Sequence, residues 1–209
     1  MKQPKFQRRS EDRPREICAA ALEVFAEKGF AAAKLDEIAR RAGVSKGTLY
    51  LYFKDKEELF RAVVRNNVTP NIDNVRDTIL AAELPFAQLA PMFLMRLSMV
   101  AGNMPLGAVV KMVIGESGNF PELARVWHEQ VVSKALAVLV ALIEKAQAKG
   151  EVRPGDPRLH AFTLMGPMLM GLIYREVLVP AGGAPIDIEA LARQHSETVL
   201  SGLLVEKGR

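Results

Sequence analysis

Apolar residues recur at helical spacing along most of the chain, and Gly and Pro separate one run from the next. Ile17, Ala21 and Val24, for example, fall on one face of a helix that Gly29 can end as a left-handed residue. Alternating runs bounded by hairpin turns do not occur in the sequence, so a β-sheet is not expected. The pattern predicts an all-α chain of about nine helices. The expected helices cover residues 12–29, 35–42, 45 onward, 55–84, 85–101, 105–116, 121–149, 157–179 and 187–205.

Side chains that can cap a helix precede several of these runs. Proline should disturb two of the helices, because it lacks an N–H and clashes with the preceding turn. Pro70 is expected to kink or divide the helix that starts near residue 55, and Pro167 is expected to bend the helix at 157–179. The expected N-cap residues are Asp12, Ser45, Asp55, Asp156 and Asp187.

Positive charge is concentrated in the first third of the chain. Residues 1–65 hold 15 Lys and Arg against 10 Asp and Glu, a net charge of +5, whereas the remainder holds 13 against 14. A basic module on a nearly neutral body indicates a polyanionic partner, and a slightly basic solvated surface is the alternative. The N-terminus lacks the apolar core of a secretory signal, and no uninterrupted apolar stretch is long enough to span a membrane. With Cys18 as its one cysteine, the chain is expected in the cytoplasm.

Two short helices are predicted within residues 35–56, LDEIARRAGVSKGTLYLYFKDK. Gly43 permits the positive φ of a tight turn between them. The second helix starts after Ser45 and is too short to be stable alone, so Leu49 and Phe53 must hold it against the first. Its remaining residues then face outward. They are Lys46, Gly47, Thr48, Tyr50 and Tyr52.

This outward face has the chemistry of a surface that binds nucleic acid. Lys, Thr and Tyr side chains donate hydrogen bonds to phosphates or base edges, and a helix N-terminus favours phosphate. Such a helix, braced by its neighbour, is typical of a recognition helix that enters a major groove by its N-terminus.

The same stretch resembles the tetracycline-repressor (TetR) family of transcriptional regulators. The resemblance rests on GVSKGTLYLYFKDKEELF at residues 43–60, with AALEVFAEKGF and LDEIARRAG before it, and it covers about residues 12–65. It implies a basic flexible arm at 1–11, a three-helix helix-turn-helix domain at 12–55, and a helical domain for ligand sensing and dimerisation at 56–209.

The resemblance also implies a set of DNA-binding residues. Lys46, Gly47 and Thr48 match positions that approach bases or phosphates, and Lys56 matches a lysine that clamps the DNA backbone. Lys34 departs from the family pattern, because a Ser or Thr usually caps the helix there; a lysine could reach phosphate instead. The full predicted set is Lys34, Ser45, Lys46, Gly47, Thr48, Tyr50, Tyr52 and Lys56.

Methionine is concentrated in the C-terminal part, where eight of nine lie between Met92 and Met170. Methionine adapts to irregular cavities and apolar ligands, and simple core filling is the alternative. The resembled family encloses a small-molecule pocket with its middle helices, so a small apolar or amphipathic ligand is expected. The candidate ligand-contacting residues are Met92, Met95, Arg96, Met99, Met112, Glu116, Trp127, His128, Met165, Met168 and Tyr174.

The last two expected helices carry apolar stripes that predict a homodimer. Two such helices from each subunit would form a four-helix interface, as the family implies, and burial within one subunit is the alternative. The predicted interface residues are Leu159, Phe162, Gly166, Leu169, Ile173, Leu191, His195, Val199 and Leu203.

Enzymatic and metal sites are not expected. Residues 43–47 fit the G-x-S-x-G elbow of serine hydrolases, but a helix rather than a strand precedes Ser45. The three histidines lack metal-ligand spacing, and no nucleotide-binding motif or other cofactor signature is present. The sequence therefore predicts a repressor, located in the cytoplasm with the nucleoid, that a ligand releases from a palindromic operator. The alternatives are a DNA-binding protein of the same fold without a ligand and, more remotely, a hydrolase using Ser45.

Overall fold

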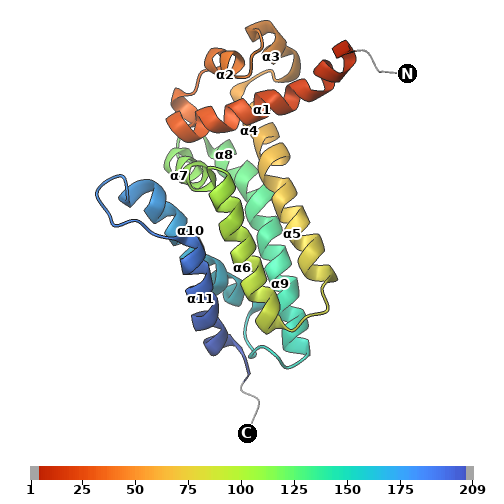
Figure 1. Ribbon diagram of the computed structural model, residues 1–209, viewed down its shortest axis with the longest axis vertical. Coiled ribbons are helices and arrows are strands. Elements are labelled where there is room, and N and C mark those ends of the chain that lie inside the picture. The colour runs from red at the N-terminus through yellow and green to blue at the C-terminus, as the bar shows by residue number, and fades with distance from the viewer. Residues whose placement is uncertain (1–4, 206–209) are drawn as a thin grey trace. The chain divides into compact units, whose positions relative to one another are not determined.

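The computed structural model describes the backbone of residues 5–205 and the side chains of residues 12–205 except residue 80 (Figure 1). Three π-helical turns join or extend the α-helices, so that the described residues form nine continuous helices, as the sequence predicts. The π-helical turns are η1 (Val64–Val68), η2 (His128–Val132) and η3 (Tyr174–Leu178). The α-helices are α1 (Lys5–Ala32), α2 (Leu35–Arg41), α3 (Lys46–Tyr52), α4 (Lys56–Val63), α5 (Thr69–Ala81), α6 (Phe86–Asn103), α7 (Leu106–Glu116), α8 (Pro121–Trp127), α9 (Ser133–Ala148), α10 (Pro157–Ile173) and α11 (Ile188–Leu203).

The prediction that the chain is all-α, without a β-sheet, is confirmed as well. Among the described residues, β-type pairing is limited to one isolated bridge between Val152 and Leu204. The fold is therefore all-α.

Local signals set most helix starts. The Ser45 hydroxyl accepts a hydrogen bond from Thr48 N, and the Asp55 carboxylate accepts one from Glu58 N. Asp156 and Asp187 cap α10 and α11 in the same way. Each cap satisfies an N–H that has no partner within its own helix.

Two expectations about helix ends differ from the structure. Asp12 is not a cap, because α1 already begins at Lys5; residues 5–11 of the predicted arm are helical, and residues 1–4 lie outside the described residues. Pro70 does not divide its helix. The π-helical turn η1 comes just before it, and α5 continues through Pro70 to Ala81.

The chain forms two compact units. The first joins the residues up to 70 to residues 112–131, and the second joins residues 71–111 to those from 132 onward. The predicted boundary after residue 55 differs from this division, because Leu59, Phe60 and Val63 of α4 are buried and α4 packs on α1.

An aromatic cluster forms the core of the first unit. Phe30 lies at its centre, with ring centroids 5.5 Å from Phe25, 6.0 Å from Phe60 and 5.0 Å from Phe120. These rings come from α1, α4 and the residue before α8, so the cluster ties distant segments of the chain together. Aromatic pairs at such separations contribute beyond the area they bury.

The second unit is a bundle of long helices. α6 lies beside α11, and α10 packs on α9 and α11 (Figure 1). Leu94, Leu139, Ile143 and Leu164 are fully buried in it.

Two helical segments, Pro121–Ala148 and Pro157–Leu178, are long and apolar enough to cross a membrane by length and composition alone. The sequence predicts no span, because polar residues interrupt each apolar stretch. The finding differs because each segment, averaged over a window of 18 residues, is apolar and carries few charges; 28% of each window is buried.

Candidate nucleic-acid interface

α3 presents one face to the protein and the opposite face to solvent. Leu49 is fully buried and Phe53, which follows the helix, is 6% exposed. An α-helix turns about 100° per residue, so Gly47 and Leu51 lie nearly opposite Leu49, about 160° and 200° around the axis. The buried side is therefore apolar, as predicted, and it fixes the orientation of the short helix on α2.

Two pairs of polar side chains flank this outward midline. Lys46 and Tyr50 lie one turn apart on one flank, and Thr48 and Tyr52 lie one turn apart on the other. Tyr50 is 45% exposed. The structure thus places five of the predicted DNA-binding residues on α3, around the side opposite Leu49.

Ser45 and Thr48 fix the start of α3. Their hydroxyls lie 2.8 Å apart and share a hydrogen bond, and Ser45 Oγ also accepts from Thr48 N at 3.0 Å. Ser45 follows the turn after α2 rather than a strand, so the geometry of a nucleophile elbow is absent at this serine. Lys34 precedes α2 without a side-chain cap and is exposed.

Lys46 forms an ion pair on this surface. Its Nζ lies 2.8 Å from Asp36 Oδ1 on α2, and both side chains are more than half exposed. The hydrogen bond to Asp36 raises the pKa of the Lys46 ammonium. The carboxylate therefore competes with any phosphate for the same ammonium.

An Asp36→Asn variant is expected to bind random-sequence duplex DNA about threefold to tenfold more tightly than the wild type at low salt, because it removes both the competing partner and a repulsive charge. Fluorescence anisotropy measures this. Glu83→Gln is the matched control, since it removes an exposed carboxylate after α5. Equal effects of the two substitutions would contradict the role given to Asp36.

Lys56, which the family resemblance assigns to the DNA backbone, binds backbone carbonyl groups of its own chain. Its Nζ donates to the carbonyl oxygens of Phe30, Ala31 and Ala33 and lies 4.6 Å from the centroid of the Phe30 ring. Burial lowers the pKa of the ammonium, while the Glu116 carboxylate acts to raise it. Lys56 therefore holds the link between α1 and α2, and its contact with DNA stays a prediction.

Glu116 holds the same link from the other side. Its carboxylate accepts hydrogen bonds from Phe30 N at 2.9 Å and Ala31 N at 2.7 Å. These N–H groups are available because Gly29, with φ 79° and ψ 172°, breaks the regular path of α1. Glu116, predicted to contact a ligand, thus holds the end of α1 that precedes α2. Local sequence carries no signal for this contact, because the partners lie 85 residues or more apart.

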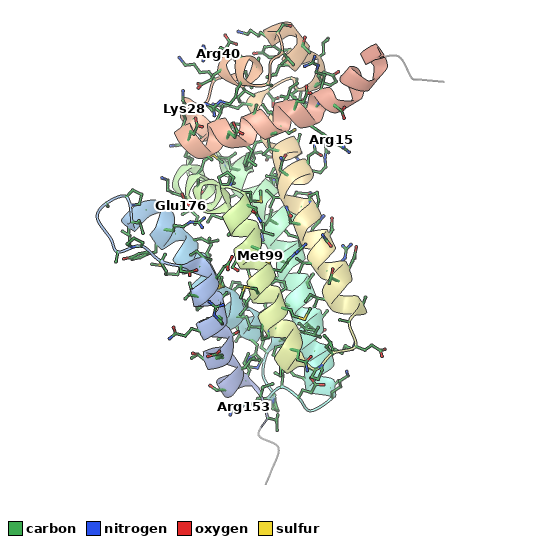
Figure 2. All side chains as sticks on the ribbon, viewed as in Figure 1. Arg15, Lys28, Arg40, Met99, Arg153 and Glu176 are labelled. Atoms are coloured by element: carbon green, nitrogen blue, oxygen red, sulfur yellow. The ribbon has the colours of Figure 1, made fainter. Side chains whose placement is uncertain are left out.

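Ion pairs tie α2 to the end of α1. Lys28 pairs with Glu37 at 2.7 Å, and Arg41 pairs with Glu27 at 2.6 Å. The hydrogen bond from Lys28 lowers the pKa of Glu37. Arg40 is exposed on α2, and Figure 2 labels it together with Lys28.

The predicted ligand-contacting residues divide between the two units and differ in exposure, and their contact with a ligand stays a prediction. Met112 and Trp127 are buried in the first unit, whereas Met168 is buried in the second. Met92 and Met99 are exposed on α6 (Figure 2 labels Met99). Arg96 is also exposed, Met95, Met165 and Tyr174 are half-buried, and His128 begins η2. The spacing of apolar residues in the sequence shows which side chains share a helix face. It does not show whether another helix, a ligand or solvent covers that face.

A cavity of about 290 Å³ lies in the second unit between α5 and α9. It is close to the lower end of the range of about 300–1,000 Å³ for small-molecule sites. None of the predicted ligand-contacting residues lines it. Its lining residues are Ile72, Asp73, Arg76, Lys134, Ala137 and Val138.

The predicted dimer residues divide into two groups. Leu159, Phe162 and Leu169 are exposed on α10, as is Gly166. The α11 residues are more covered: Val199 and Leu203 are buried, Leu191 is half-buried, and His195 Nε2 lies 3.1 Å from Leu164 O. Ile173 is half-buried as well. Val199 and Leu203 are already covered within one subunit. Among the predicted dimer residues, those of α10 therefore supply most of the exposed apolar surface.

No group of three or more His, Cys, Asp or Glu that could hold a metal ion occurs among the described residues. Cys18 is buried, and burial raises the pKa of its thiol, which disfavours the reactive thiolate.

Comparison with known proteins gives a consistent result. Residues 17–63 match the family described as bacterial regulatory proteins, tetR family, and residues 91–182 match a tetracyclin repressor-like C-terminal domain. A fatty acid metabolism regulator protein of Bacillus subtilis is 28% identical over 190 residues, covering 90% of this chain and 94% of the relative.

Solved structures agree in fold. The crystal structure of a TetR-family transcriptional regulator from Mesorhizobium loti has 30% identity and a TM-score of 0.72, covering 94% of this chain and 99% of that chain. The regulator FadR from Bacillus subtilis, in complex with stearoyl-CoA, has a TM-score of 0.75 at 23% identity, covering 90% and 98%.

Proposed function

This chain belongs to the TetR family of DNA-binding transcriptional regulators, which are soluble proteins and not enzymes, and we propose that it is a homodimeric repressor released from a palindromic operator by a small ligand. The observation that carries the proposal is the orientation of α3, which buries Leu49 and exposes Lys46, Gly47 and Tyr50. We also propose that it acts in the cytoplasm, where the operator is.

The outward face of α3 supports binding in a major groove. Gly47 has no side chain and lies near the start of the helix, so backbone can approach DNA closely there. Lys46 and Tyr50 on one flank, with Thr48 and Tyr52 on the other, supply donors to the phosphates on either side of the groove. One helix of this length reads few bases, which favours two copies on two half-sites.

The exposed face of α10 supports the dimer. Leu159 is 63% exposed and Phe162 is 50% exposed, and Leu169 and Met170 continue the apolar face. Apolar side chains clustered in this way mark an interaction surface. We assign the face to a second copy of the chain, which also accounts for the apolar, little-buried character of Pro157–Leu178.

A Phe162→Glu variant is expected to raise the dissociation constant of the dimer about 100-fold or more, because it places a charge at the centre of the proposed interface. Analytical ultracentrifugation measures the change, and the helical circular dichroism should be retained. Ile114→Glu serves as the control, since Ile114 is 58% exposed on α7. A Phe162→Glu protein that stays dimeric at nanomolar concentration would refute the assignment of this face.

Ligand release is supported by the relatives and by the cavity of the second unit. The Bacillus subtilis FadR structure contains stearoyl-CoA, an amphipathic molecule of the kind that the methionine-rich part of this chain suggests. Lys134 at the cavity is a cationic group suited to an acidic headgroup, whereas Arg76 there is paired with Asp73 and Asp77 at 2.9 Å. Stearoyl-CoA is therefore the first probe, with free coenzyme A as the control lacking the acyl chain.

Two measurements test the proposal. Selection of bound fragments from a random DNA pool should recover a palindrome, and its affinity should fall steeply with salt. Stearoyl-CoA should then raise the melting temperature and weaken operator binding, whereas coenzyme A should not. Operator binding unaffected by any apolar ligand favours a DNA-binding protein of this fold without a sensor, and recovery of no sequence refutes the repressor.

A further inference from the structure

Leu51 is the most exposed large apolar side chain among the described residues, with 83% of its surface accessible. The residues on its flanks, Tyr50 and Tyr52, carry hydroxyl groups, and the residue one turn earlier is Gly47. Leu51 is therefore the one side chain on the outward midline of α3. Leu51 is absent from the predicted DNA-binding set, although its position two residues after the buried Leu49 places it on the outward side of the helix.

A single exposed leucine elsewhere on a protein surface needs no explanation. Here the leucine occupies the centre of a surface whose other members are polar, where a lysine or serine would be better solvated. The midline of a helix that lies in a groove meets base edges, while its flanks meet the phosphates on both sides. An apolar group at that place matches one feature of the major groove, the C5-methyl group of thymine.

We propose that Leu51 is a specificity-determining residue that reads a thymine methyl group in each half-site of the operator. The inference rests on the proposed function, because it requires that α3 lie in the major groove. Gly47 supports it: without a side chain there, the first turn can come close to the groove floor and bring Leu51 with it. The contact is apolar and excludes water, so it discriminates thymine from cytosine without a hydrogen bond.

The test uses operator duplexes in which single thymines are replaced by deoxyuridine at symmetric positions of both half-sites. This replacement removes one methyl group and leaves base pairing intact. For the wild type, one position should show a loss of affinity of about fourfold per half-site, or about 15-fold in total, as expected for one methyl group no longer buried. Fluorescence anisotropy at one fixed salt concentration measures each duplex.

The Leu51→Ala variant should bind the thymine operator about 15-fold more weakly or worse and should lose its sensitivity to deoxyuridine at that position only. Ile114→Ala, at an exposed apolar residue of α7, should keep the wild-type pattern. If the wild type binds the operator but no thymine is sensitive, or if the sensitivity survives in Leu51→Ala, the inference is overturned and the repressor stands. If no DNA sequence is recovered, both are overturned.

Discussion

Replacing Lys46 by Ala and Tyr50 by Phe together is expected to lower operator affinity about 100-fold or more while the protein stays folded. Each subunit loses one charged and one neutral donor to phosphate, and a dimer loses both twice. The Lys46 substitution also leaves Asp36, its partner at 2.8 Å, unopposed on the surface that meets the DNA. Both side chains point away from the core, so the melting temperature should change little.

Anisotropy titrations over a range of salt concentrations measure this effect. The slope of log affinity against log salt should decrease by about two, since each lysine that contacts phosphate contributes about one. Lys111→Ala with Tyr174→Phe is the matched control, because it makes the same two changes outside α3. Affinity within threefold of the wild type and an unchanged salt slope would contradict the proposed surface.

Gly29→Ala is expected to destabilise the first unit by about 3 kcal/mol or more. Its φ of 79° and ψ of 172° lie in a region that is essentially restricted to glycine, and a residue forced there costs about 1–3 kcal/mol. A Cβ at this position would also collide with Glu116 Oε1, which accepts the hydrogen bond from Phe30 N. Displacement of the whole carboxylate leaves the Phe30 and Ala31 N–H groups without their acceptor and adds to the cost.

Chemical denaturation monitored by circular dichroism measures the loss of stability. Gly102→Ala is the control, because Gly102 lies in α6 with open space around its Cα and alanine should be neutral or stabilising there. A Gly29→Ala/Glu116→Ala protein separates the two causes: the collision disappears, so the double variant should lose less than the sum of the single variants. A Gly29→Ala protein as stable as the wild type would show that the break in α1 is unimportant.

Most of the helices from α1 to α4 could be predicted because their signals are local. Ser45 and Asp55 cap the helices that follow them, and Leu49 lies on the buried side at helical spacing. Once that side was known, the outward position of Tyr50 followed from the turn of the helix. The family resemblance covers this same region, where the physical pattern is strongest.

The rest depends on contacts between distant segments, which periodicity cannot specify. Glu116 binds the link after Gly29 from 85 residues or more away, and Phe120 joins the aromatic cluster of α1 and α4. The methionines of α6 form a stripe in the sequence, but Met92 and Met99 face solvent. Lys56 illustrates a further limit, because a lysine at the start of a helix is equally suited to phosphate and to the carbonyl groups that it binds here.

Hydrogen–deuterium exchange with and without the selected operator tests the central claim most directly. We predict slower exchange on DNA binding for the amides of residues 45–53, because α3 enters the groove and becomes shielded and rigid, with no comparable change along α10. Protection elsewhere in the chain, with residues 45–53 exchanging as in the free protein, would contradict the claim that α3 is the surface that binds DNA.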